Sequence, residues 1–249
     1  MSIELKNVTY TYSPGTAYEI HALKDINLSI PDGQFIGIIG HTGSGKSTLI
    51  NLIPRFYDVT SGSIRIDGID VRDFNIKTLR SKIGFIRQKT LLFTGSIKSN
   101  IKFGKRKASH EEMVHSAKVA QAYDFINKKE KKFDEPIGEG GSNVSGGQKQ
   151  RLSIARALVR KPEIYIFDDS FSALDFKTDA ILRAELKKET THAIVLIVAQ
   201  RIGSIMDADK IIVLVEGNVV GIGKHKELLK TCSVYKEIAL SQLTEEELA

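Results

Sequence analysis

The sequence predicts an α/β fold that has a core with a mainly parallel sheet, an N-terminal antiparallel β subdomain and an inserted α-helical subdomain. Apolar, strand-like runs alternate with helical patterns toward both ends of the chain, which is typical of parallel sheets. A glycine-rich loop joins one apolar run to a helical pattern. A mostly helical stretch, from about residue 95 to about residue 160, interrupts the alternation, so we expect it to be a lobe inserted between two halves of one core.

The first 40 residues are predicted to be β-structure. Tyr10-Thr11-Tyr12 and Ile26–Ile30 alternate by side-chain type, and Pro31-Asp32-Gly33 predicts a turn. Phe35–Ile39 is a short apolar run, the pattern of a buried parallel strand. The elements expected next are a helix from Ser47 to about Ile53 and strands at Ser63–Ile66 and Ile83–Ile86.

The helical stretch carries charges of both signs. Glu111–Lys118 and Asn127–Lys132 are predicted helix faces rich in Lys and Glu, and the run Lys128–Lys132 is interpreted as a solvated helix end rather than a partner site. After this stretch the α/β alternation returns, and helices close the chain before an acidic tail, Glu245–Glu247, that we expect to fray. The expected elements are strands at Ile164–Phe167, Ala193–Ala199, Lys210–Val215 and Asn218–Gly221 and a helix at Lys177–Lys188.

Length and composition are those of an ordinary soluble globular protein, with 41% hydrophobic and 27% charged side chains among 249 residues. The net charge of +6 favours a lysine-rich solvated surface over a nucleic-acid or membrane surface, and no nucleic-acid partner is expected. Cys232 is the one cysteine, which excludes a disulfide within the chain and fits a reducing compartment.

Membrane and export signals are missing from the sequence. No run reaches the roughly 18 apolar residues that span a bilayer, and the N-terminus lacks the apolar core of a signal peptide. Any work on a membrane is therefore expected to go through a separate partner. We expect residues 1–249 to form one domain, in which residues 1–88 and 160–249 make the α/β core and residues 89–159 the inserted helical subdomain.

Gly40-His41-Thr42-Gly43-Ser44-Gly45-Lys46-Ser47 matches the phosphate-loop pattern G-x-x-x-x-G-K-[ST] in full, between an apolar strand and a helix. Glycines let the backbone curl so that successive N–H groups face phosphates, and the helix N-terminus adds partial positive charge. Lys46 would reach the β- and γ-phosphates, and Ser47 would offer a hydroxyl to Mg²⁺. The candidate phosphate-binding residues are Gly40, Thr42, Gly43, Ser44, Gly45, Lys46, Ser47 and Thr48.

Ile164–Phe167 is an apolar strand that ends in a carboxylate, Asp168. At the carboxyl edge of a parallel sheet this residue would face the phosphate loop and hold Mg²⁺. The alternative is that Asp168 is an acidic cap or turn residue. This is the weaker interpretation because the same chain also carries the phosphate loop. Asp169 follows directly, and a carboxylate there can orient and polarise an attacking water.

Val144-Ser145-Gly146-Gly147-Gln148 lies between these two motifs in the chain and resembles the LSGGQ signature of ABC ATPases, with Val144 in place of Leu. Ser145 can cap a helix whose glycines leave its N-terminal amides bare. The resemblance covers nearly the whole chain and implies a P-loop NTPase core that binds ATP and Mg²⁺. It also implies that Ser145, Gly146, Gly147 and Gln148 contact the γ-phosphate of ATP held by a second ABC nucleotide-binding domain, head to tail.

The same resemblance gives further residues a role. Tyr12 corresponds to an aromatic that stacks on adenine, although a core aromatic is the alternative. Gln88 corresponds to a glutamine that senses Mg²⁺ and touches the membrane subunit, and Glu139 lies in a segment that contacts membrane-domain loops of exporters. Asp175 ends Ser172-Ala173-Leu174-Asp175, a loop that crosses the dimer interface. The chain would then lie on the cytoplasmic face of a membrane, held by transmembrane subunits.

Two residues depart from the family pattern in a way that predicts a degenerate catalytic site. Asp169 stands where the family has glutamate, one methylene longer, and Gln200 stands where it has a switch histidine. A carboxylate about 1.5 Å short, one C–C bond, positions water poorly, and misplacement by about 1 Å can cost about 100-fold in rate. We therefore predict catalytic roles for Lys46, Gln88, Asp169 and Gln200 but low turnover, as in the degenerate half of heterodimeric exporters. Arg87 and Val215 also depart from the family pattern, without an interpretation.

Residues 1–50 resemble the ATPases of energy-coupling-factor importers more than exporters, whereas the chain resembles exporters from Pro54 onward. A recombined or designed chimera with a seam near Asn51 is one hypothesis for this, and an unusual natural lineage is the other.

Two other functions compete with that of a transport motor. A soluble ABC protein acting on DNA or ribosomes is disfavoured because a coiled coil or tandem domains do not fit in 249 residues. A non-catalytic ATP-dependent dimerisation module stays open.

Overall fold

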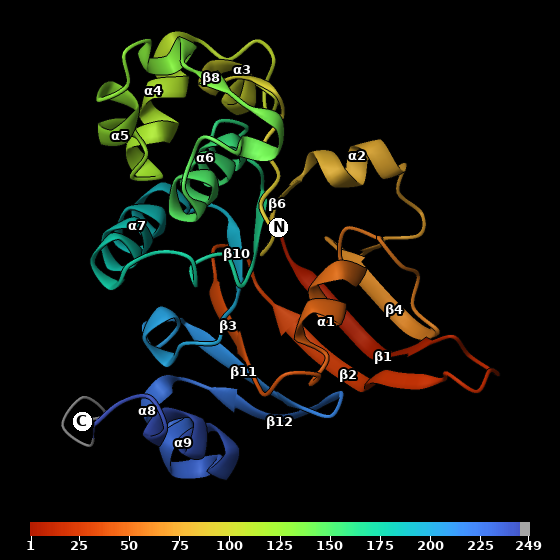
Figure 1. The fold of residues 1–249 in the computed structure, drawn as a ribbon. Helices are drawn as coiled ribbons and strands as arrows, with labels where there is room; N and C mark the ends of the chain where they lie inside the picture. The colour runs from red at the N-terminus through yellow and green to blue at the C-terminus, as the bar shows by residue number, and fades with distance from the viewer. Residues whose placement is uncertain (245–249) are drawn as a thin grey trace.

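The computed structural model describes residues 1–244, which form two large sheets, a two-stranded sheet, a helical lobe and a pair of C-terminal helices (Figure 1). The acidic tail Glu245–Glu247, which was expected to fray, lies outside the described residues. Within residues 1–244 none of the helices has the length and apolar character needed to cross a bilayer.

The N-terminal sheet is antiparallel throughout, as predicted, with strand order β2-β1-β4-β5. The hairpin of β1 and β2 pairs Ile3 with Ile30 at one end and Tyr12 with Ile20 at the other. Tyr12, at the end of β1, therefore lies beside Ile20, which is eight positions later in the sequence. The bounds are β1 Ile3–Tyr12, β2 Ile20–Ile30, β4 Ser61–Ile66 and β5 Ile69–Asp70.

The main sheet has the order β12-β11-β3-β10-β9-β6, and all its pairings are parallel except that of β11 with β12. This confirms the mainly parallel sheet. The central strands β3, β9 and β10 are apolar and almost completely buried, because helices or the second sheet cover both faces. The bounds are β3 Phe35–Ile39, β6 Ile83–Ile86, β9 Ile164–Asp168, β10 Ile194–Val198, β11 Lys210–Val215 and β12 Asn218–Gly223.

Helices α3 to α6 come between β6 and β9 in the chain and form the upper lobe in Figure 1. Their bounds are α3 Ile97–Lys102, α4 His110–Val119, α5 Tyr123–Asn127 and α6 Gly146–Leu158, with the short strands β7 Gly95–Ser96 and β8 Pro136–Ile137 beside them. The remaining helices are α1 Lys46–Leu52, α2 Ile76–Ser81, α7 Phe176–Glu189, α8 His225–Thr231 and α9 Ser233–Leu240, with 3₁₀ turns at Lys132–Asp134, Glu139–Gly141 and Ile202–Ser204.

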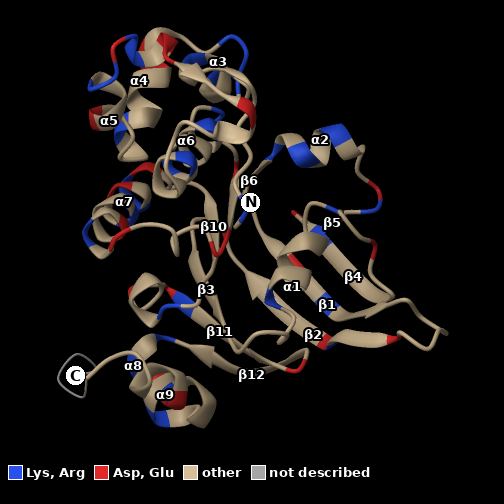
Figure 2. Ribbon diagram, viewed as in Figure 1, with Lys and Arg blue, Asp and Glu red and all other residues tan. Residues whose placement is uncertain are grey.

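Two local expectations were wrong. The predicted helical face at Asn127–Lys132 is not a helix, because α5 ends at Asn127 and Lys132 has a left-handed φ of 48°. Helix α2 was not predicted, although Asn75 marks its start by accepting a hydrogen bond from the backbone N–H of Lys77. The mixed charges of the lobe do lie at its surface, since Glu111, Lys118, Lys128 and Lys132 are all exposed. Figure 2 shows basic and acidic residues in this lobe.

Helix α1 lies between the two sheets and makes contact with β2 on one side and with β9 and β10 on the other. Leu49, Ile50, Leu52 and Ile53 are buried in one apolar cluster that joins the antiparallel sheet to one face of the parallel sheet. A second apolar cluster covers the opposite face and extends into the helical lobe and the C-terminal helices. The start of α1, which is the end of the phosphate loop, is thus fixed by packing on both sides.

We predict that Leu49→Ala lowers the free energy of unfolding by about 2–5 kcal/mol, because Leu49 is 2% exposed and its removal leaves a cavity between the sheets. Leu240→Ala on α9 is the matched control, since Leu240 is 46% exposed and should cost within about 0.5 kcal/mol. Denaturant unfolding of both variants measures the difference. Equal costs would contradict the packing described for α1.

Candidate functional site

A cavity of about 660 Å³ lies beside the phosphate loop. It lies where β3, β9 and β10 end, and because these strands are parallel, their carboxyl ends meet at one edge of the sheet. Residues from seven separate parts of the chain line it, namely Tyr12, Ile20, His21, Ala22, Lys24, Thr42, Gly43, Ser44, Gly45, Lys46, Ser47, Thr48, Gln88, Asp169, Val198, Gln200 and Glu216.

The phosphate loop requires glycine at two positions, because a different backbone carbonyl group lies close to each of them. Gly40 has a φ of 155°, and a Cβ there would lie 2.1 Å from the carbonyl oxygen of Leu214. Gly45 has a φ of 99°, and a Cβ would lie 2.5 Å from the carbonyl oxygen of Ala22. The loop therefore fits closely between β2 and the end of β11 only without side chains at these positions.

The ammonium group of Lys46 is folded back over its own loop. Its Nζ donates to the carbonyl oxygens of Gly40 and His41 at 2.7 Å each and to the hydroxyl of Ser44 at 3.2 Å. Burial lowers the pKa of Lys46, and the charges of Asp169 and Asp168 act against that shift. A cation held in this position can exchange its carbonyl partners for phosphate oxygens as these enter the loop.

Ser47 and Asp168 come together although 121 positions separate them in the chain. The Ser47 hydroxyl donates to Asp168 Oδ1 at 2.9 Å. Burial raises the pKa of the Asp168 carboxyl, while the hydrogen bond from Ser47 and the charge of Lys46 lower it. A hydroxyl and a carboxylate side by side are hard oxygen ligands, the type that suits Mg²⁺. These two residues could therefore hold that ion.

Asp169 is held by two amides. Its Oδ2 accepts a hydrogen bond from Gln88 Nε2 at 2.7 Å and another from Gln200 Nε2 at 2.6 Å. The residue is 7% exposed, and burial raises its pKa, against which the Gln88 hydrogen bond acts. Its φ of 46° is left-handed, a conformation that Asp tolerates better than most residues. Three of the four predicted catalytic side chains, Gln88, Asp169 and Gln200, thus form one connected cluster.

Tyr12 lines the cavity wall at the end of β1. Its hydroxyl lies 3.1 Å from the hydroxyl of Thr48, and its ring packs edge-on against Tyr10, with centroids 4.8 Å apart. Tyr57 completes the cluster, with its centroid 6.0 Å from that of Tyr12. The ring is held from behind and from its hydroxyl end, which leaves it available as a platform for a flat ligand.

Ser145 to Gln148 and Asp175 do not line the cavity. Ser145 caps α6 by accepting from the backbone N–H of Gln148, and Gln148 Oε1 accepts from the backbone N–H of Ser145 in return. Asp175 caps α7 by accepting from the N–H of Thr178, which lowers its pKa. A Cβ on Gly147 would lie 3.3 Å from the carbonyl oxygen of Ala173, so the two caps are neighbours on a separate face.

Several cavity residues were missed by sequence reasoning. Ile20 and Ala22 enter through β2, because the hairpin register places Ile20 beside Tyr12. Glu216 enters through the β11–β12 turn, whose Gly217 N–H donates to the carbonyl oxygen of Ser44 at 3.1 Å. The position of Ile20 depends on a hairpin register that shifts at several points between Leu5 and Thr11, and that of Glu216 depends on the pairing of β11 with the distant strand β3. No local motif encodes either. The alternation of apolar residues in β2 could have predicted a strand at Ile20 and Ala22. It could not have predicted that this strand lies beside the cavity. The other missed cavity residues are His21, Lys24 and Val198.

Comparisons with known proteins agree with these features. A family model described as ABC transporter matches residues 23–172. The chain is 44% identical over 236 residues to a "Putative multidrug export ATP-binding/permease protein" of Staphylococcus aureus (strain NCTC 8325 / PS 47), with 95% of this chain and 40% of that protein covered. The protein of the same description from strain bovine RF122 / ET3-1 is 45% identical over 236 residues.

Among solved structures, the chain is similar to one described as "Structure of a bacterial Atm1-family ABC exporter with ATP bound". The TM-score is 0.93 at 35% sequence identity, and the match covers 98% of this chain and 42% of that one. The chain spans about two-fifths of the length of the curated relatives that it matches, since their covered share is 40%.

We predict that Lys46→Ala abolishes nucleotide binding, with an affinity loss of at least about 100-fold, because the variant loses the ammonium group that is folded over the loop and with it at least two charge-assisted hydrogen bonds (about 1.5–3 kcal/mol each). Binding of a fluorescent ATP analogue, with thermal unfolding to check the fold, measures this. Lys77→Ala on exposed α2 is the matched control and should bind like the wild type. Unchanged affinity in Lys46→Ala would refute the phosphate-loop assignment.

Proposed function

The chain belongs to the ABC transporter family, and we propose that it is a nucleotide-binding unit that binds Mg-ATP and powers transport across a membrane by ATP-driven dimerisation with a second such domain. The observation that carries this proposal is the cavity at the carboxyl edge of the parallel sheet. There Lys46 and Ser47 meet a carboxylate pair, Asp168 and Asp169, that is 121 to 123 positions away in the sequence. A phosphate loop facing an acidic strand end is what a Mg-nucleotide requires.

The predicted site residues in and beside the cavity have separate proposed tasks. The amides of Gly43 to Ser47 and the ammonium group of Lys46 bind the phosphates, and Ser47 and Asp168 hold Mg²⁺, which would neutralise phosphate charge. Tyr12 offers its ring to adenine. No cluster of three or more His, Cys, Asp or Glu suited to a metal occurs among residues 1–244. That agrees with an ion such as Mg²⁺, which is bound through one or two protein groups together with phosphate oxygens.

The second face of the molecule is proposed to act in the partner's site. Ser145, Gly146, Gly147 and Gln148 form the capped N-terminus of α6, and Asp175 lies beside it through Gly147 and Ala173. Since these residues lie away from the chain's own cavity, they are free for a nucleotide held by a second domain. A helix N-terminus with bare glycine amides attracts such an anion.

We further propose that the chain's own site hydrolyses ATP slowly. Asp169 reaches less far than the family's glutamate, and Gln200 carries no charge. Both lone-pair directions of Asp169 Oδ2 are occupied by amide donors from Gln88 and Gln200, so an attacking water would have to use the other carboxylate oxygen, Oδ1. A composite site of this kind would retain ATP, and a competent partner would supply turnover.

This proposal predicts that the wild-type chain is nearly inert and that the double variant Asp169→Glu, Gln200→His gains at least tenfold in steady-state ATP turnover, or about 1.4 kcal/mol of barrier. The longer carboxylate can reach the water, and imidazole can meet the γ-phosphate. Adding Lys46→Ala to the double variant should abolish the gain, which excludes a contaminating ATPase. A wild-type turnover of about 1 s⁻¹ would show that Asp169 and Gln200 suffice and would contradict slow hydrolysis.

Two alternatives follow from the same residues. If the double variant gains nothing but the chain dimerises with ATP, the chain is a non-catalytic dimerisation module.

The chimera hypothesis is separate: a seam near Asn51 would fall inside α1, whose buried residues pack against both sheets. Equal identity of residues 1–50 and 51–249 to one natural exporter would contradict it. For the domain organisation, we propose that residues 1–88 and 160–249 form the α/β core and that residues 89–159 form the helical subdomain.

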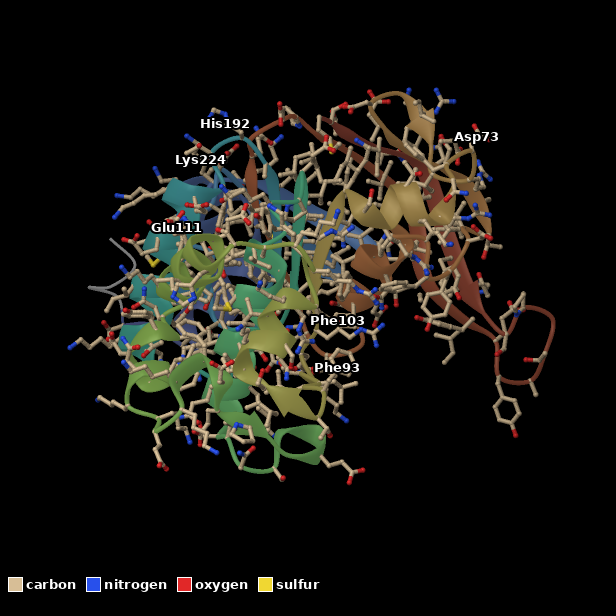
Figure 3. All side chains as sticks on the ribbon, turned by 90° about the horizontal axis from the view of Figure 1, so that it is seen from above. Asp73, Phe93, Phe103, Glu111, His192 and Lys224 are labelled. Atoms are coloured by element: carbon tan, nitrogen blue, oxygen red, sulfur yellow. The ribbon has the colours of Figure 1, made fainter. Side chains whose placement is uncertain are left out.

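The partner on the membrane side is proposed to be a transmembrane subunit or domain that docks on an apolar patch formed by Leu91, Phe93 and Phe103. These side chains are 67%, 47% and 61% exposed. Phe93 and Phe103 lie side by side on the helical lobe, with ring centroids 4.6 Å apart (Figure 3). Exposed apolar side chains gathered in this way mark an interaction surface.

Arg156 supports this patch from beneath. Its guanidinium lies 5.1 Å from the Phe93 ring centroid and donates to the carbonyl oxygens of Leu91 and Asn100 at 3.0 Å each, and burial lowers its pKa to about 10. Arg156 therefore links the backbone of Leu91 and Asn100 to the Phe93 ring. It follows Gln88 by three positions, and the pairing of Gly95 with Ile137 brings the Glu139 segment close to it. A partner docked on this patch could therefore affect Asp169 through the hydrogen bond that Gln88 donates to it.

We predict that the tagged chain, expressed in its own host, sediments with the membrane fraction and that Phe93→Glu combined with Phe103→Glu releases most of it, since two carboxylates cannot be buried against an apolar partner. The matched control is Ile69→Glu combined with Val220→Glu, which changes two side chains of similar exposure, 50% and 45%, on other elements. Equal sedimentation of both double variants would refute the patch as the docking site.

A further inference from the structure

The loop that carries Gln200 is held by a residue at the far end of the chain. Gln242 Nε2 donates to the backbone carbonyl oxygen of Gln200 at 2.8 Å, and Gln242 Oε1 accepts from the backbone N–H of Ile202, also at 2.8 Å. One side-chain amide thus bonds the backbone at two points on either side of Arg201. Two bonds in this arrangement fix both the position and the rotation of the intervening peptides.

The loop depends on such support because sheet pairing stops just before it. Strand β10 ends at Val198, and the last ladder-like bond is from the Ala199 N–H to the carbonyl oxygen of Ile38 at 3.0 Å. The 3₁₀ turn begins only at Ile202. Gln200 and Arg201 therefore lie between two regular elements, where backbone groups need partners from elsewhere.

Gln242 is itself well anchored. Its backbone N–H donates to the carbonyl oxygen of Ala239 at 3.1 Å, at the end of α9. Helix α9 is fixed by Tyr235, which is fully buried and whose hydroxyl lies 2.7 Å from Nδ1 of His225 on α8. Leu243, the next residue, packs against the core. The C-terminal helices thus give Gln242 a fixed base from which to hold the loop.

The loop transmits this constraint directly to the cavity. Gln200 Nε2 donates to Asp169 Oδ2 at 2.6 Å, so the backbone that Gln242 fixes carries the amide that contacts Asp169. On its other side, Arg201 lies 4.7 Å from the ring centroid of Phe176, beside Asp175. From this chain of contacts we infer that Gln242 is a positioning residue of the nucleotide site, which sets how residue 200 faces Asp169 and the terminal phosphate. The inference rests on the proposed function.

The test uses the isosteric variant Gln242→Met, which keeps the side-chain length but loses both hydrogen bonds. Ser241→Ala is the matched control, because the Ser241 hydroxyl donates only within its own helix end, to the carbonyl oxygen of Ile238 at 2.7 Å. Two readouts are compared: the side-chain amide signals of Gln200 in two-dimensional ¹⁵N NMR spectra of the nucleotide-free chain, assigned with Gln200→Met, and steady-state ATP turnover in the Asp169→Glu, Gln200→His background.

Gln242→Met is expected to shift or broaden the Gln200 amide signals and to lower turnover about tenfold, with the ATP dissociation constant within twofold of its background, because the phosphate loop is untouched. Ser241→Ala should change neither. Unmoved Gln200 signals, or moved signals with unchanged turnover, would overturn the inference. Loss of ATP binding in every variant, the wild type included, would instead refute the proposed function, and the NMR spectra of the nucleotide-free chain would still decide whether Gln242 positions Gln200.

Discussion

The site depends on the parallel pairing of three adjacent strands. Val198 of β10 is in register with Ile38 of β3 on one side and with Asp168 of β9 on the other. The chain leaves the sheet at the same level in all three strands, so the phosphate loop, the carboxylate pair and the Gln200 loop begin side by side. A shift of one residue in either pairing would turn each following side chain to the opposite face and would separate Ser47 from Asp168.

What could be predicted from the sequence follows from how far apart the contacting residues are. Lys46 and Ser47 belong to one continuous motif, and Asp168 ends an apolar run, so local pattern sufficed to bring them together. Ile20 reaches the cavity through a hairpin whose register is shifted at several points, and Glu216 reaches it through a turn after a strand that pairs with the distant β3. The two hydrogen bonds of Gln242 join residues some 40 positions apart and have no local pattern at all.

The cluster around Asp169 combines features that cost stability. A carboxylate at 7% exposure, a left-handed backbone and a second carboxylate next to it all raise the free energy of the folded chain. The amides of Gln88 and Gln200 compensate by donating to the charge. Such local cost is typical of residues retained for chemistry or binding rather than for packing, and it fits the position of this cluster at the rim of the cavity.

Helix α1 is only seven residues long, yet it is enclosed by apolar side chains from both sheets. An isolated helix of that length would not persist in water, so its existence is a product of its surroundings. A ligand gripped at its first turn is therefore mechanically coupled to two separate layers of the molecule. Occupancy of the phosphate loop would stiffen both sheets together, and the empty chain would be looser across its whole width rather than at the loop alone.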